Sequence, residues 1–209
     1  MNIMNENKIQ GHIIRPFSPA IGKYKIPQNT IDVLNDFIDQ ILKDEKKIED
    51  NYYGNQLAGE IKFELKLSND FINQNLYQLL KDYVFNFVKS TTRKELKTFE
   101  IISSWAVCQF ESDYNPVHWH NGHISGVMYT KMPKDFGSSY KKDNWNGNIA
   151  FLQGATQFTS TGAFRAKPEI GDLYLFPSNM MHTVYPFFSN EERRSISFNA
   201  FLDEETVRI

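Results

Sequence analysis

Asn115-Pro-Val-His-Trp-His-Asn-Gly-His-Ile-Ser-Gly-Val-Met-Tyr129 is the stretch that decides how this chain is organised, because histidines lead directly into a strand pattern. Successive side chains of an extended chain point to opposite faces, so His118 and His120 would share one face, with Trp119 on the other. Two neutral imidazoles at this spacing can chelate one divalent metal ion. Outside this stretch the C-terminal half contains one more histidine, His182. The sequence therefore predicts a fold that brings these two segments together.

The composition is typical of one globular domain in a reducing compartment. A chain of 209 residues can bury a sizeable core, and its 23 basic and 25 acidic residues give a net charge of −2. This balance argues against a nucleic-acid surface built on phosphate contacts. The single cysteine, Cys108, excludes an internal disulfide and lies in an apolar run. No apolar run approaches the roughly 20 residues of a membrane span, and the N-terminus lacks the apolar centre of a signal peptide. We therefore expect a cytoplasmic protein with no membrane partner.

The N-terminal part of the chain begins with a predicted amphipathic helix. Apolar residues recur at helical spacing over 31–46, and Asn29 or Thr30 is the expected N-cap. The run 43–50 mixes both charges, so we interpret it as the exposed end of this helix.

A strand and a second helix follow. Apolar and charged residues alternate over 61–67, which predicts a half-buried strand. Ser68 is the expected cap of a helix whose apolar face extends to Val88. The aromatic residues on that face are typical of core packing.

From about residue 99 onwards, short strand patterns punctuated by glycines predict a β-sandwich or barrel. The expected strands are 99–111, 123–131, 147–152, 163–167, 172–176, 182–187 and 193–202. No linker interrupts the chain, so we expect one domain over 1–209. In it, residues 1–98 would be a support region for a β core over 99–209, and the helices would cover one sheet.

Four motifs in this order resemble the Fe(II)/2-oxoglutarate-dependent oxygenases of the prolyl-hydroxylase-like group. They are His118-Trp-His120, Ile124-Ser-Gly-Val-Met-Tyr129, Gly171-Asp-Leu-Tyr-Leu-Phe-Pro-Ser178 with His182, and Glu192-Arg-Arg-Ser-Ile-Ser-Phe-Asn199. The likeness is sharp over 100–202, and it is strongest to a largely uncharacterised subgroup in bacteria and phages. It implies a mainly β fold with helices, the double-stranded β-helix or jelly roll, with the N-terminal helices packed on one sheet. For a phage-encoded chain, the compartment would be the host cytoplasm.

The resemblance also implies a site. Fe(II) would be held by His118, His120 and His182 as metal ligands and catalytic centre, and 2-oxoglutarate would bind that iron and extend inward to an arginine. Arg193 lies eleven residues past His182 and shares a strand face with Ser195, which suits a buried carboxylate.

Two further residues complete the expected cosubstrate site. Tyr129 resembles a tyrosine that hydrogen-bonds the cosubstrate from the neighbouring strand. Arg194, which has the opposite parity to Arg193, is the second choice of anchor. The resemblance also implies O₂ as the second cosubstrate. Ascorbate is a possible further cofactor in this family.

One departure from the family pattern leaves the metal open. His120 stands where Asp or Glu is expected, although the subgroup commonly has His-x-His. Three imidazoles also suit zinc or copper. His123 has the wrong parity to join His118 on one strand face, so we do not expect it to be a ligand.

The function implied is hydroxylation of a C–H bond in a peptide side chain or a small molecule. The alternatives are a cupin-like three-histidine metalloenzyme that does not use 2-oxoglutarate, and a non-catalytic jelly-roll metal-binding module. We expect the loops 134–146 and 153–163 to frame the substrate entrance, and Trp105 and Trp119 to be packing residues. The oligomeric state stays open, a homodimer included.

Overall fold

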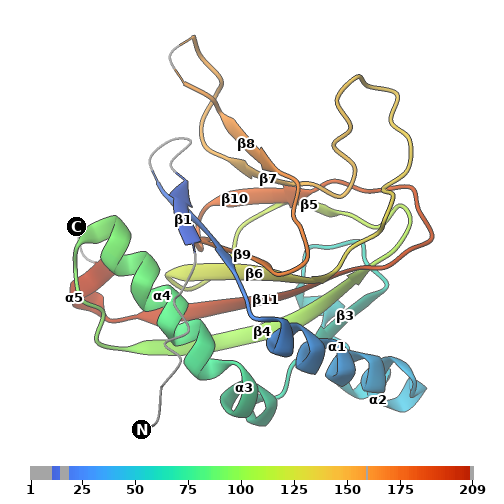
Figure 1. Cartoon of the computed structure of the whole chain (residues 1–209), viewed down its shortest axis with the longest axis horizontal. Helices are drawn as coiled ribbons and strands as arrows, with labels where there is room; N and C mark the ends of the chain where they lie inside the picture. Colours follow the sequence, from blue (N-terminus) through green and yellow to red (C-terminus); the bar gives the residue numbers. More distant parts are fainter. Residues whose placement is uncertain (1–10, 15–18, 159, 208–209) are drawn as a thin grey trace, which may run out of the picture.

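The computed structural model describes residues 11–14, 19–158 and 160–207. A seven-stranded sheet and a four-stranded sheet, both antiparallel, form the body of the protein (Figure 1). The large sheet has the order β1-β2-β9-β6-β11-β4-β3, with strands β1 (Gly11–Ile14), β2 (Ile21–Lys25), β3 (Phe63–Lys66), β4 (Phe99–Gln109), β6 (Ile124–Lys131), β9 (Asp172–Pro177) and β11 (Arg193–Leu202). The small sheet has the order β5-β10-β7-β8, with strands β5 (Asn115–His118), β7 (Ile149–Leu152), β8 (Ala163–Ala166) and β10 (Met181–Val184).

Strict alternation along the strands gives the large sheet two different faces. On β9, Leu173 and Leu175 point into the core under the helices, whereas Tyr174 and Phe176 join the core between the two sheets. A strand with both faces buried lacks a polar side, which explains the nearly continuous apolar run 173–176. Side chains from β7 and β10, such as Phe151 and Val184, fill the second core from the small sheet.

Five α-helices and one short 3₁₀-helix are assigned within the described residues: α1 (Gln28–Leu42), α2 (Glu45–Asn51), η1 (Gly54–Gln56), α3 (Asn69–Asn75), α4 (Tyr77–Thr92) and α5 (Glu204–Val207). The apolar stripes of α1 and α4 pack on the large sheet, where Leu34, Ile38, Leu80 and Val84 are fully buried. The helices therefore cover the face opposite the small sheet (Figure 1), as the sequence predicts. None of the described helices is long and apolar enough to cross a membrane.

The helix boundaries differ from the sequence-based prediction at three places. The N-cap of α1 is Pro27, without a side-chain cap, in place of Asn29 or Thr30. The charged run is not the end of α1, because the Asp44 side chain accepts backbone hydrogen bonds and starts the separate, exposed helix α2. The second helix, which Ser68 caps as predicted, is broken at Leu76 into α3 and α4.

The predicted strands of the C-terminal half are all present, with ends that differ by a few residues. Cys108 is fully buried, as expected of a core residue. The prediction for 61–67 is wrong in one respect that matters for function. Its charged side was expected to be exposed, but Glu64 on β3 is only 1% exposed.

Candidate active site

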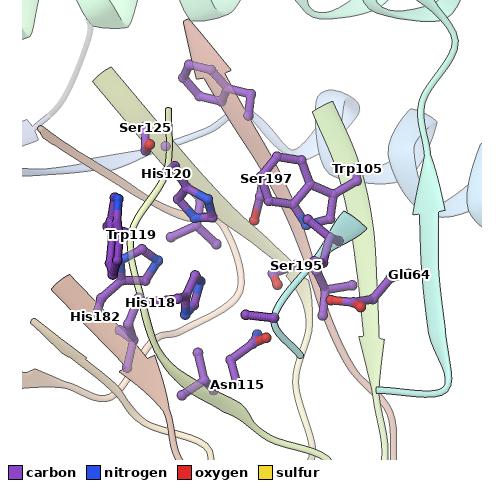
Figure 2. Close-up of a pocket in the computed structure, with 18 of the residues that line it drawn as sticks. Glu64, Trp105, Asn115, His118, Trp119, His120, Ser125, His182, Ser195 and Ser197 are labelled. Carbon is purple, nitrogen blue, oxygen red and sulfur yellow. The ribbon is translucent and has the colours of Figure 1, made fainter. Parts of the chain in front are cut away.

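Three histidine rings meet at one side of a pocket between the two sheets (Figure 2). His118 ends β5 and is the cross-strand partner of His182 on β10, so the pairing of two short strands sets these two side chains next to each other. Their ring centroids are 4.2 Å apart, and the ring of His120 lies 4.9 Å from His118 and 5.0 Å from His182. The potential ligand nitrogens all lie within 4.8 Å of one another. Among the described residues, this is the only such cluster of metal-binding side chains.

Backbone carbonyls orient two of the three imidazoles. Nδ1 of His118 lies 2.7 Å from the carbonyl oxygen of Pro116, and Nδ1 of His182 lies 2.9 Å from that of Met180. A carbonyl can only accept a hydrogen bond, so Nδ1 must carry the proton and Nε2 keeps its lone pair. Histidines that bind metals are typically held in this way by an outer hydrogen bond. His118 and His182 therefore have the tautomer and orientation that a metal site needs.

His120 is placed by the turn that follows β5 rather than by a strand. Its backbone N–H donates to the carbonyl of Ser178 at 2.9 Å, and its ring lies edge-on to Trp105 at 5.4 Å. Gly122 makes the turn possible, because its φ of 101° favours glycine and a Cβ there would lie 2.9 Å from the carbonyl oxygen of Ala200. Only the loop conformation brings His120 to the other two rings.

Burial keeps the cluster uncharged. It lowers the pKa of His118, and it lowers that of His120 to about 4, with the neighbouring His118 adding to the shift. Burial together with the two nearby imidazoles lowers the pKa of His182 to about 3. Neutral imidazole is the form that binds a metal ion. The donor set therefore fits a divalent transition metal at neutral pH.

The opposite wall of the pocket is formed by alternate residues of β11. Arg193, Ser195 and Ser197 line it, while Ile196 belongs to the core under the helices; Phe198 belongs to that core and also borders the pocket. Arg193 is 1% exposed, and its Nε donates to the Gly147 carbonyl at 3.1 Å. This confirms the strand parity inferred from the sequence.

The guanidinium of Arg193, a residue that lines the pocket, retains an unused donor. Nη1 donates to the Gln109 side chain, but Nη2 is buried with no hydrogen-bond partner in the described part of the chain. The guanidinium lies 4.9 Å from the ring centre of Tyr129, whose hydroxyl likewise lacks a partner among those residues. Unpaired buried donors are costly, so this corner fits an anionic ligand with several acceptor oxygens.

Arg194 has a different environment on the other side of β11. Its Nη2 lies 2.6 Å from Asp39 of α1 and 2.9 Å from Glu192, so its charge is already neutralised by carboxylates. The guanidinium is part of the contact between the sheet and the helices. It does not line the pocket, and this leaves Arg193 as the arginine placed to meet a ligand there.

The pocket rim differs from expectation. Trp119 was expected to be a packing residue, but it is 64% exposed; Trp105 is buried, as expected for packing, and both tryptophans line the pocket. None of the described residues in 134–146 or 153–163 lines the pocket; both loops project on the side of the small sheet (Figure 1). The residues that cover the pocket instead come from 56–58, just before β3.

The structure brings together all six predicted site residues in one pocket: His118, His120, His182, Arg193, Ser195 and Tyr129. His123 lies outside it and accepts a hydrogen bond from the backbone N–H of Leu202 at Nδ1. The sequence analysis missed Glu64, which lines the same pocket. Its charge among alternating apolar residues gave no sign of burial, because that pattern is also typical of an exposed strand face.

Comparisons with known proteins agree with this geometry. Residues 103–199 match the family model described as "Putative 2OG-Fe(II) oxygenase", and no protein of curated function matches the chain. A prolyl-4-hydroxylase from Pseudomonas putida has a similar structure, with a TM-score of 0.58, 14% identity, and coverage of 88% of this chain and 92% of that one.

Two other solved structures give the same result. The viral collagen prolyl hydroxylase of Paramecium Bursaria Chlorella virus-1, a 2-oxoglutarate complex, has a TM-score of 0.54 at 12% identity, covering 86% and 94% of the two chains. HygX from Streptomyces hygroscopicus, with nickel, 2-oxoglutarate and hygromycin B bound, has a TM-score of 0.58 at 8% identity, covering 87% and 82%. These neighbours confirm the double-stranded β-helix. The family match spans the three histidines and the first residues of β11, so this part of the chain is similar to the 2-oxoglutarate- and Fe(II)-dependent oxygenases.

Proposed function

We propose that the enzyme hydroxylates a C–H bond of a peptide side chain or a small molecule in this pocket. His118, His120 and His182 hold the iron, and Arg193 receives the distal carboxylate of 2-oxoglutarate. The observation that carries the proposal is the buried Nη2 of Arg193, which has no protein partner among the described residues and belongs to a side chain that lines the same pocket as three neutral imidazoles. An anion that binds a metal ion held by the imidazoles and extends to the guanidinium would satisfy the unpaired donor of Arg193.

The chemistry supplied by iron and 2-oxoglutarate is the oxidation of the cosubstrate by O₂ to succinate and CO₂, with the second oxygen atom inserted into the substrate C–H bond. The protein's own contribution is positional. Arg193 and Ser195 supply hydrogen-bond donors to the carboxylate, and the nearby Tyr129 hydroxyl can add one. The apolar residues Val127, Ile149 and Phe176 line the same space and limit access of water.

We propose that His120 is a true ligand in place of the expected carboxylate. The close approach of its ring to the other two and its lowered pKa support this role. The balance of charge also favours it, since Fe²⁺, three neutral ligands and the 2-oxoglutarate dianion sum to zero. A buried site without net charge avoids the desolvation penalty of an isolated ion.

We also propose a single-domain organisation and a cytoplasmic location for the enzyme. Residues 1–98 would act with 99–209 as one domain, because the helices α1 and α4 form the core under the large sheet. The single buried cysteine fits a cytoplasmic enzyme.

The test is an anaerobic titration of the Fe(II) protein with 2-oxoglutarate. We expect a weak visible metal-to-ligand charge-transfer band that saturates at one equivalent, and a requirement for much more 2-oxoglutarate in Arg193→Ala. A protein that binds Fe(II) but shows neither the band nor heat of 2-oxoglutarate binding would instead support the cupin-like three-histidine alternative.

A further inference from the structure

Glu64 lines the pocket from the large sheet, the same sheet that carries the proposed cosubstrate residues Arg193, Ser195 and Tyr129. It is paired with Val107 on β4, which is paired with Ser195 on β11, which is paired with Tyr129 on β6. Residues in one such row across a sheet point to the same side. Figure 2 shows Glu64 on the wall opposite the histidines, beyond Ser195.

The fold gives this carboxyl group little compensation for its burial. Glu64 is 1% exposed, and its Oε2 makes no hydrogen bond to any described residue. Burial raises its pKa to about 8, with the negative charge of Asp113 adding to the shift. Among the described pocket residues, Arg193 is the only lysine or arginine, and we have assigned its remaining donor to 2-oxoglutarate. Without a ligand the carboxyl group is therefore mostly protonated at neutral pH, and its ionised form is costly in this place unless a cationic ligand compensates the charge.

A second oxygen lies near the same point. A Cβ at Gly59 would be 2.4 Å from Oδ1 of Asn115 and 2.9 Å from Oε1 of Glu64, so these two acceptors lie close together against a backbone position that has room only for glycine. The three residues directly before Gly59, which are 56–58, line the pocket. Two convergent acceptors, one of them a carboxyl group, match a donor that carries several N–H bonds and a positive charge.

We propose that Glu64, with Asn115 beside it, recognises a cationic nitrogen group of the substrate, a primary ammonium or a guanidinium. Bound there, the group would place a neighbouring carbon of the substrate between Glu64 and the histidine cluster. The inference rests on the proposed function, because it assigns the substrate class of that site. A free amine and the side chain of a basic peptide share this chemistry.

The experiment is a binding titration under anaerobic conditions with the Fe(II)–2-oxoglutarate protein. The probes are n-butylammonium and n-butylguanidinium, with n-butanol as the neutral analogue, and the amides of Nα-acetyl-lysine and Nα-acetyl-arginine represent a peptide. Binding is followed by the change in the visible charge-transfer band and by calorimetry. We expect at least one cationic probe to bind roughly 10- to 100-fold more tightly than n-butanol. Tighter binding of the free butyl cations would indicate a small-molecule substrate, and tighter binding of the acetylated amino-acid amides would indicate a basic peptide.

Glu64→Gln tests the assignment with little change of shape. We expect it to lower the affinity for the cationic probe to that of n-butanol, to leave 2-oxoglutarate affinity within about two-fold, and to raise the melting temperature at pH 8.5, where the carboxyl group is ionised. Glu60→Gln is the matched control, since this nearby glutamate is exposed and lies outside the pocket lining. It should change none of these quantities.

Two results would overturn the inference while the proposed function stands. One is that no cationic probe binds at concentrations of about 10 mM although the charge-transfer band is present. The other is that Glu64→Gln binds the cation as well as the wild type, or melts at a lower temperature because the carboxyl group serves the fold. If the band itself is missing, the proposed function has failed.

Discussion

Arg193 and Arg194 are neighbours in sequence, yet they show how differently the two faces of the large sheet are built. Both side chains are buried on β11. On the helix side, Arg194 is neutralised by Asp39 and Glu192. On the pocket side, Arg193 keeps a donor that has no partner in the described residues, beside the hydroxyl of Tyr129 in the same condition. The buried arginine on the helix side is paired with carboxylates of the protein itself. The buried polar groups on the pocket side need a ligand to complete their hydrogen bonds.

This difference predicts that substitutions on the pocket side reduce binding, whereas substitutions on the helix side reduce stability. The largest effect should come from His182→Ala, which removes the best-buried member of the histidine cluster. We expect tight Fe(II) binding to be abolished, with the fold retained, because the ring contributes little to the core. Calorimetric titration with Fe(II) or Co(II) measures the affinity.

His123→Ala is the control for His182→Ala, because it removes a histidine that lies outside the cluster and should keep the wild-type metal affinity. Unchanged metal affinity in His182→Ala would refute the site.

The second largest effect should be that of Arg193→Ala on 2-oxoglutarate. Loss of a charged donor to a buried carboxylate costs on the order of 2–5 kcal/mol, which is roughly 30- to several-thousand-fold in affinity. Metal affinity without cosubstrate should change little. Titration of the Fe(II) protein with 2-oxoglutarate measures the loss of affinity. An equally large loss in Arg194→Ala would contradict the assignment of cosubstrate binding to the pocket side of β11.

Arg194→Ala should show the reverse pattern. Removing one member of a buried ion pair typically costs 3–5 kcal/mol, but Asp39 is 41% exposed and keeps Lys131 as a partner. We therefore expect a decrease of about 2–4 kcal/mol in the free energy of unfolding, measured by urea denaturation. The affinity for 2-oxoglutarate should be within a few-fold of the wild type; a stable variant with weak cosubstrate binding would contradict the assignment.

The smallest effect concerns acid stability of the metal-free protein. The pKa of His182 is lowered from its ordinary value near 6.5 to about 3, so between these values the unfolded chain binds a proton that the folded chain does not. Stability should therefore fall as the pH falls from about 6.5 towards 4, by up to about 2 kcal/mol at pH 5 from this residue.

Thermal unfolding with a chelator at pH 7 and pH 5 measures this loss, and His182→Gln isolates it from the titration of other groups. The variant should lose less stability than the wild type over this interval. Equal losses in the two proteins would show that burial of this imidazole does not control acid stability.

Much of the site could be predicted because it depends on local geometry. The two-residue periodicity of a strand placed Arg193 and Ser195 on one face and Ile196 on the other, and the structure has them so. The facing histidines also followed from residue type and motif order. Helix ends were predicted less well, since Asp44 competes for backbone donors and starts a new helix where charge pattern alone suggested continuation.

What the sequence by itself determined is the His118–His120 pair, the alternating faces and the amphipathic helices, because each depends on residues close together in the chain. Only the tertiary structure decided that Glu64 is buried, that Trp119 lies on the rim and that residues 56–58 cover the pocket. Those outcomes depend on which distant segment packs over each face. On β3 the face of Leu65 packs in the helix core, and Glu64 on the other face lies in the pocket with residues 56–58 and Asn115, so a position that looks exposed in sequence is buried while Lys66 on the same face stays exposed.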